Sequence, residues 1–153
     1  LQTYIYRLVS CLMKIVPLSG LNIIKFGDFK GKAIELFGSP DIIENEGGKD
    51  GVSPEILEYK THGIRLYFDP DLGFKLWSLS INSDNVELDG VKPVGYSEAD
   101  LLTHFPSLEL EVSDGIFKDY VDNSRELLFF LRNGVVKRID VSPKLEDFLE
   151  KYG

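Results

Sequence analysis

Residues 58–81 read EYKTHGIRLYFDPDLGFKLWSLSI and decide the fold of this 153-residue chain. Ile64, Leu66 and Phe68 alternate with more polar residues, which is the period-two pattern of a strand with one buried face. The Asp-Pro-Asp-Leu-Gly sequence of residues 69–73 is typical of a turn. A second apolar run follows, so the stretch predicts two antiparallel strands joined by a turn.

The returning strand has an irregular pattern. Phe74 and Leu76 lie on one parity, whereas Trp77, Leu79 and Ile81 lie on the other. One regular strand cannot bury both sets on the same face of a sheet. The sequence therefore predicts either a bulge near Leu76 and Trp77 or burial on both faces.

A shorter and more polar version of this unit recurs near the end of the chain, as ELLFFLRNGVVKRIDV in residues 126–141. Its Asn133-Gly134 pair predicts a tight hairpin, because both residues readily adopt positive φ angles. A helical pattern precedes each hairpin region, at residues 28–37 and 97–105. The same order of elements is thus predicted twice.

We therefore predict an α+β fold in which helices cover one face of an antiparallel sheet. Residues 13–153 are expected to form one domain made of two helix-plus-hairpin repeats, about 13–85 and 86–153. The alternative is that both halves follow an order common among α+β proteins, without any duplication.

Other segments predict further elements. Asp28 and Ser97 are placed to cap the two helices, and Asp100 completes a weak capping box with Ser97. The polar, glycine-rich segment 42–54 predicts a mobile loop. The remaining predicted elements are strands at 15–26, 55–60, 108–112, 116–121, 127–131 and 135–141, and a final helix at 144–152.

Composition limits the classes of function. The formal net charge is −8, so binding to a nucleic-acid backbone, which needs basic residues, is not expected. Cys11 is the single cysteine, which excludes an internal disulfide and a cysteine-rich zinc site. Absent disulfides suit a reducing compartment, and we expect a cytoplasmic protein. No apolar run has the length of a membrane span.

Residues 1–12, LQTYIYRLVSCL, are unlike the rest of the chain and precede Met13, which resembles a natural start. We interpret them as an upstream extension or a tag-like segment. Their apolar residues have helical spacing, so an amphipathic helix that rests on the body or on a neighbouring molecule is one alternative. The Leu8–Cys11 sequence also resembles a lipoprotein cleavage box, although Arg7 interrupts the apolar run before it.

Few residues suggest chemistry. His62 and His104 are the only histidines, and neither falls in a pattern with carboxylates that zinc or general-base chemistry requires. Asp69 and Asp71 flank a proline and are typical turn residues. We expect no catalytic residue, no metal and no cofactor. A small hydrolase with a site near His62, Asp69 and Asp71 is the enzymatic alternative.

Surface character favours protein binding instead. Aromatic residues provide most of the affinity in protein interfaces, and Tyr59, Tyr67, Trp77 and Tyr120 are candidates for that role. Acidic residues attract a basic partner and speed its association. The candidate acidic residues are Glu109, Glu111 and Asp114. The alternative is that the aromatic residues belong to the core and the acidic residues to a solvated face.

The chain resembles known families in the order of its segments. Ala33–Asp41 (AIELFGSPD), Glu58–Tyr59, Gly63–Asp69 (GIRLYFD), Gly73 and Trp77–Ile81 together resemble small bacterial proteins that include immunity proteins of toxin systems. Residues 26–141 also resemble the tandem helix-plus-sheet repeat of β-lactamase inhibitor proteins. That family is secreted and contains disulfides, and this chain departs from it on both counts, so no target or contact residue is carried over.

The resemblance to immunity proteins of contact-dependent or polymorphic toxin systems implies a small acidic chain that blocks one cognate toxin. Together with the acidic composition, it predicts a non-enzymatic binding protein that occludes the active site of a basic toxin domain, with neither nucleic acid nor a membrane as partner. A structural or oligomer subunit, suggested by residues 1–12, is a further alternative.

Overall fold

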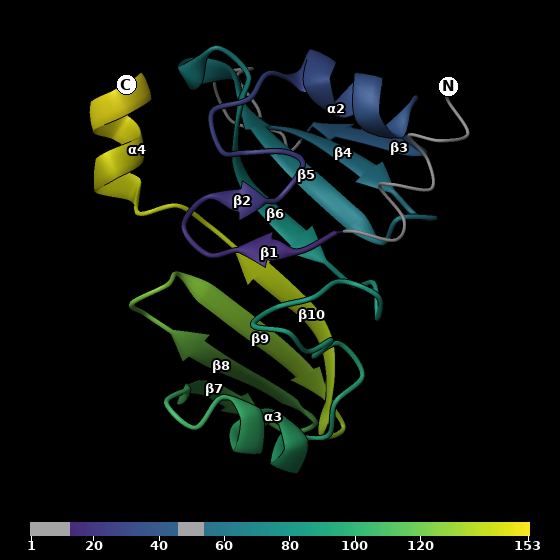
Figure 1. Cartoon of the computed structure of the whole chain (residues 1–153), viewed down its shortest axis with the longest axis vertical. Coiled ribbons are helices and arrows are strands. Elements are labelled where there is room, and N and C mark those ends of the chain that lie inside the picture. The colour runs from purple at the N-terminus through teal and green to yellow at the C-terminus, as the bar shows by residue number, and fades with distance from the viewer. Residues whose placement is uncertain (1–12, 46–53) are drawn as a thin grey trace.

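A large antiparallel sheet of eight strands organises the computed structural model, which describes residues 13–45 and 54–153 (Figure 1). Within these residues there are also a two-stranded sheet and three α-helices, so the predicted α+β class is confirmed. The small sheet pairs β1 (Ile15–Val16) with β2 (Gly20–Leu21). None of the helices in the described part of the chain is long and apolar enough to cross a membrane.

The eight strands follow the order β3-β4-β5-β6-β10-β9-β8-β7. Strands β3–β6 form one consecutive meander and β7–β10 form another, and their last strands, β6 and β10, pair with each other at the centre. The strands are β3 (Ile42–Asn45), β4 (Glu55–Tyr59), β5 (Ile64–Asp69), β6 (Lys75–Ile81), β7 (Glu109–Asp114), β8 (Phe117–Asp122), β9 (Leu127–Arg132) and β10 (Val135–Val141).

A helix precedes each meander. Helix α2 (Lys30–Phe37) comes before β3, and α3 (Glu98–His104) comes before β7, so the order of one helix and four strands occurs twice. The predicted repetition of element order is therefore present, whereas an origin by duplication stays a prediction. A third helix, α4 (Leu145–Tyr152), lies beyond the end of β10 (Figure 1).

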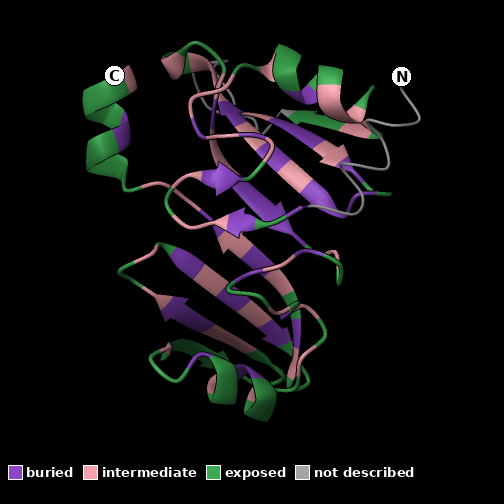
Figure 2. Ribbon diagram, viewed as in Figure 1, coloured by how far each residue is buried: buried purple, intermediate pink, exposed green. Residues whose placement is uncertain are grey.

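One face of the sheet forms the core. The register places one row of residues across six strands, and all six are buried: Tyr59, Ile64, Ile81, Ile139, Phe129 and Tyr120. Buried segments occur along the strands of both halves (Figure 2). Helix α2 covers this row through the Phe37–Tyr59 ring contact, and α3 covers it through Phe105 and Phe129. The buried residues of both halves belong to one hydrophobic cluster.

The other face, which we call the open face, carries the alternate side chains. Its central row crosses the sheet through Glu58, Arg65, Ser80, Asp140, Leu128 and Val121. Because α2 and α3 both pack on the core face, neither covers this row.

The predicted bulge in the returning strand is confirmed. Leu76 pairs with Phe68 and Ser78 pairs with Tyr67, so Trp77 is the extra residue. The bulge lets Leu76 and Leu79 project to the core face in spite of their odd spacing. Strand β10 has a similar irregularity, because Lys137 has no partner in the pairing of β10 with β9. Lys137 is the third of the seven residues of β10, as Trp77 is of β6.

Both predicted turns are present. The Asp69 carboxylate accepts a hydrogen bond from the Asp71 amide at 2.9 Å and begins the 3₁₀ turn η1 (Pro70–Leu72). Asn133 and Gly134, with φ angles of 51° and 72°, join β9 to β10 as a two-residue hairpin.

Three local expectations need correction. Residues 42–45, predicted as part of a loop, form β3, because their backbone groups pair with β4. Asp28 does not cap α2: Phe29 is the N-cap residue, and the Asp28 carboxylate accepts a hydrogen bond from the Lys25 amide at 2.7 Å. The predicted strand at 15–26 is divided into β1 and β2. The expectations for residues 1–12 and 46–53 lie outside the described residues.

Candidate functional site

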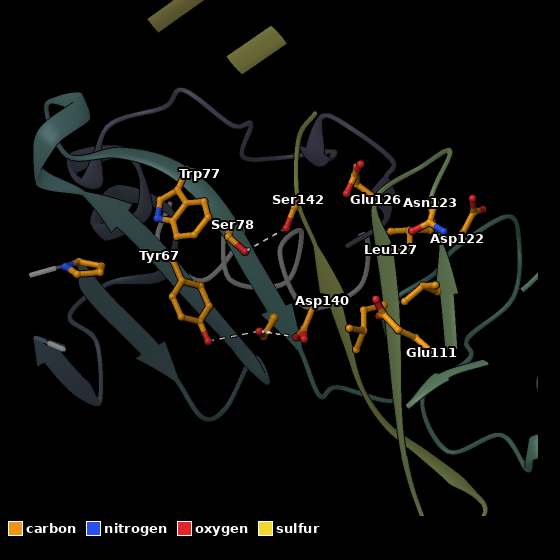
Figure 3. A pocket seen from close by; sticks show the side chains of 14 residues that line it. Tyr67, Trp77, Ser78, Glu111, Asp122, Asn123, Glu126, Leu127, Asp140 and Ser142 are labelled. Carbon is orange, nitrogen blue, oxygen red and sulfur yellow. Dashed lines mark hydrogen bonds between the residues drawn. The ribbon is translucent and has the colours of Figure 1, made fainter. Parts of the chain in front are cut away.

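The open face contains a pocket of about 520 Å³ where the two halves of the sheet meet (Figure 3). Of the seven residues of β6, only the last three pair with β10. The beginning of β6 pairs instead with the chain before α2, where the Gly27 amide donates to the Leu76 carbonyl at 2.8 Å. The two central strands therefore share only part of their length, and the pocket takes its walls from both halves.

Aromatic and aliphatic side chains form its walls. Tyr67 from β5 and Trp77 from the β6 bulge line the pocket on the side of the first half (Figure 3). Val121 and Leu128 are lining residues from the second half. The bulge matters here because it adds a residue to β6 between Leu76 and Ser78. The other lining residues are Pro54, Ser78, Ser80, Glu111, Asp122, Asn123, Glu126, Leu127, Asp140 and Ser142.

A chain of hydrogen bonds crosses the base of the pocket from one half to the other. Ser80 Oγ donates to Asp140 Oδ1 at 2.7 Å, and Tyr67 Oη lies 3.4 Å from the same Ser80 oxygen. Arg138 Nε donates to Asp140 Oδ1 at 2.9 Å. These contacts fix the positions of Tyr67 and Asp140 relative to each other.

The pocket has an excess of negative charge. Asp140 is paired with Arg138, and Asp122 is paired with Arg125 at 2.8 Å. Burial opposes ionisation of Asp122, but hydrogen bonds from Ser124 and Arg125 outweigh it and hold the pKa of the carboxyl below its usual value.

Two further carboxylates of the pocket have no cationic partner within residues 13–45 and 54–153. Glu111 lies in the bulge of β7, and Glu126 precedes β9 with a φ of 52°. Positive φ is costly for a residue other than glycine, and such strain clusters at functional sites. The two carboxylates give the pocket an uncompensated negative charge.

The predicted partner-binding residues divide between the two faces. Tyr67, Trp77 and Glu111 all line the pocket, and their role in binding a partner stays a prediction. Glu109 and Asp114 are exposed on β7 and do not line this pocket.

Tyr59 and Tyr120 are not available as binding residues, because both are buried on the core face. Tyr59 packs against Phe37, and its hydroxyl donates to the Gly38 carbonyl at 2.9 Å. Burial, with a smaller contribution from Asp41, raises the pKa of Tyr59 to about 12. The sequence did not reveal this burial, because an aromatic residue in a strand can lie on either face of the sheet. The strand register decides which face it occupies.

Tyr120 connects β8 to α3 through a side-chain hydrogen bond. Its hydroxyl donates to Glu98 Oε2 at 2.6 Å, and Lys118 Nζ donates to the same oxygen at 2.8 Å. The hydrogen bond to Glu98, together with burial, raises the pKa of Tyr120 to about 12. The hydrogen bonds from Lys118 and Tyr120 lower the pKa of Glu98.

We expect Tyr120→Phe to lower the free energy of unfolding by about 1 kcal/mol at pH 7, because a hydrogen bond to a partly exposed carboxylate is lost. The folded pKa of about 12 lies above the ordinary value of 10.0, so this tyrosine stabilises the fold below pH 10 and less as the pH rises towards 12. Thermal melting should show that the melting temperature falls less between pH 8 and pH 11 in the variant than in the wild type. Equal losses would contradict the assignment.

The residues of the hydrolase alternative are not brought together. His62 precedes β5 and Asp69 ends it, so the six residues of the strand, about 20 Å, separate them. His62 is buried beside Phe37 with ring centroids 5.2 Å apart, and burial lowers its pKa. No cluster of metal-ligating residues occurs among the residues that the structure describes.

Several pocket residues were missed by the sequence analysis. Ser78 and Ser80 alternate with apolar residues in β6. Asp140, which also lines the pocket, and its ion-pair partner Arg138 alternate with apolar residues in β10. Polar residues at every second position indicate an uncovered face. That signal was present, but it does not indicate that the two strands are neighbours.

Trp77 Nε1 is buried, and no residue that the structure describes is its hydrogen-bond partner. A buried N–H donor without a partner destabilises the folded state. Trp77→Phe removes this destabilising donor, but it also removes stabilising contacts of the indole ring, so the two effects oppose each other. We expect the free energy of unfolding to change by less than about 1 kcal/mol in urea unfolding followed by circular dichroism. A loss above about 2 kcal/mol would mean that the indole nitrogen is paired in solution.

Comparisons with known proteins give the fold. No protein-family model matches the chain, and no curated protein matches it. Two solved structures have a similar fold. The uncharacterized protein YfeY from Escherichia coli has a TM-score of 0.58 at 12% identity, covering 83% of this chain and 98% of that one. YjgB from Bacillus subtilis, a DUF4309 family protein, has a TM-score of 0.53 at 13% identity, covering 94% and 96%.

These two likenesses extend over most of each chain and show a shared fold, without carrying a function at such low identity. Neither similarity points to a toxin, an immunity protein or a β-lactamase inhibitor, so the resemblances drawn from the sequence stay predictions.

Proposed function

We propose that this protein is a non-enzymatic binding protein that holds a protein partner on the open face of its sheet. One observation carries the proposal: the pocket shared by both halves combines the rings of Tyr67 and Trp77 with the carboxylates of Glu111 and Glu126, which have no cationic partner among the described residues. Aromatic rings and carboxylates together favour a basic side chain, because a cation is attracted by both. The pocket therefore receives a lysine or arginine of the partner.

In its specific form, the proposal is an immunity protein whose partner is a basic toxin domain. The formal charge of −8 supports rapid association with such a domain. The open face is broad enough to cover an active site, since it spans a sheet of eight strands. A cytoplasmic location follows from this proposal if the toxin acts there.

The test is binding to the product of the adjacent gene, measured by calorimetry with the purified proteins, followed by rescue of cells that express that product. Tyr67→Ala should reduce the affinity at least tenfold, because it removes a pocket wall. Phe29→Ala, which removes an exposed ring 61% accessible at the start of α2, should leave affinity unchanged. Absence of binding, or equal effects of the two substitutions, would refute the proposal.

A further inference from the structure

Strand β7 leaves one edge of the large sheet open. It is the last strand in the sheet order and pairs with β8 along one side only; no other described residue pairs with it. All six of its residues are exposed (Figure 2). An edge of this kind presents unpaired backbone donors and acceptors that another strand can join.

The side chains of β7 exclude some partner strands and admit others. Natural edge strands are commonly guarded by charged side chains, especially lysine, by proline, by a β-bulge or by a covering element. The β7 sequence ELEVSD has neither lysine nor proline, and its guards are three carboxylates and the bulge at Glu111. Carboxylates repel an acidic strand but attract a basic one.

Exposed apolar side chains occur in β7 and in the residues that directly follow it. Leu110, Val112, Ile116 and Phe117 are each between 41% and 50% exposed, and they account for four of the eleven exposed large hydrophobic residues in the described part of the chain. They fall within eight consecutive residues. The β7–β8 hairpin therefore offers apolar contacts beside an open backbone edge.

Three carboxylates add negative charge to β7. The side chains of Glu109, Glu111 and Asp114 have no ion pair or hydrogen bond within the described ranges 13–45 and 54–153. The opposite edge differs, because Glu44 of β3 is paired with Arg65 at 2.9 Å. The charge at β7 remains available to a ligand.

We propose that β7 is a docking edge, which an extended partner segment of alternating basic and apolar residues joins as a ninth strand. This inference rests on the proposed binding function and specifies how the partner attaches. Backbone hydrogen bonds to β7 would provide affinity, while the acidic and apolar side chains select the sequence. Glu111 belongs to both β7 and the pocket, so the added strand continues the same binding surface.

A second copy of the chain fits this edge poorly. If two β7 strands paired antiparallel about their midpoint, Glu109 of each copy would lie opposite Asp114 of the other. Like charges directly opposite each other destabilise a strand pair, and this pairing contains two such contacts. A basic segment replaces both repulsions with attractions.

The probe is the peptide acetyl-Lys-Val-Lys-Val-Lys-Val-Lys-amide, added to the full chain and followed by calorimetry and by amide hydrogen exchange. We expect saturable binding that slows exchange in β7 at least tenfold and leaves β3 unchanged. Replacing the first and third valines of the peptide with proline keeps its charge but prevents strand pairing, and should weaken binding at least tenfold. A peptide with glutamate in place of lysine should not bind.

Variants of the chain complete the test. Glu109→Lys with Asp114→Lys should weaken binding of the lysine peptide at least tenfold. Glu35→Lys with Glu150→Lys makes the same change in net charge at exposed helical positions, and should have less than a threefold effect. Unchanged exchange in β7, or equal binding of the proline peptide, overturns the inference.

The two proposals can fail separately. If the adjacent gene product binds and loses affinity with Tyr67→Ala, but binds the Glu109→Lys/Asp114→Lys variant as tightly as wild type, the docking edge is wrong and the binding function stands.

Discussion

Replacing Phe129 with alanine is expected to lower the free energy of unfolding by about 3–5 kcal/mol. Phe129 is completely buried in β9 and packs against Phe105, with ring centroids 5.5 Å apart. It lies opposite Tyr120 in β8 and Ile139 in β10. Removing its ring would therefore open a cavity between α3 and the second half of the sheet.

The same substitution tests whether the two halves unfold together. Trp77 is the only tryptophan and lies in β6 of the first half, whereas Phe129 lies in β9 of the second, so Trp77 fluorescence in urea reports mainly on the unfolding of β6. One hydrophobic cluster spans both halves, and β6 and β10 pair through three residues. We therefore expect Trp77 fluorescence and circular dichroism to shift equally. An unchanged Trp77 transition beside a shifted circular dichroism transition would show two independent units.

Phe130→Ala is the matched control. Phe130 is the next residue and the same type, but it lies on the open face, where it stacks with Phe117 and under Arg138. Because it is only half-buried, its removal should cost about 1 kcal/mol. A loss as large as that of Phe129→Ala would mean that the open face is covered in solution.

The sequence was sufficient for the parts of the fold that depend on local pattern. Alternation predicted β5, and the Asn133-Gly134 pair predicted the last hairpin. The mixed parity of Leu76 and Trp77 predicted the bulge, because an extra residue is what restores a common face to Leu76 and Leu79. In each case the physical cause acts within a few residues of the signal.

The parts that failed depend on distant neighbours. Residues 42–45 carry little strand pattern and become β3 through pairing with β4. Tyr59 and Tyr67 look alike in sequence, yet the register buries Tyr59 and places Tyr67 in the pocket. The hydrogen bond between Ser80 and Asp140 joins residues 60 positions apart, and no local pattern indicates it.

The largest effect on binding is expected from Glu111→Lys combined with Glu126→Lys. These are the pocket carboxylates without a cationic partner in the described part of the chain, and reversing them replaces an attraction for a basic side chain with a repulsion. Electrostatic steering changes association rates by about 10- to 1,000-fold. We expect association with the adjacent gene product to slow at least tenfold at low salt, as measured by stopped-flow mixing.

The control must separate a local field from overall charge. Glu35→Lys with Glu150→Lys shifts the formal net charge by the same four units, from −8 to −4, at exposed positions of α2 and α4. If the pocket directs the partner, this control should slow association less than threefold, and the difference between the variants should shrink as salt screens the charges. Equal slowing would assign the attraction to net charge and remove the argument for the pocket. Both variants alter exposed side chains, so unfolding free energies within about 0.5 kcal/mol of wild type would exclude misfolding as the cause.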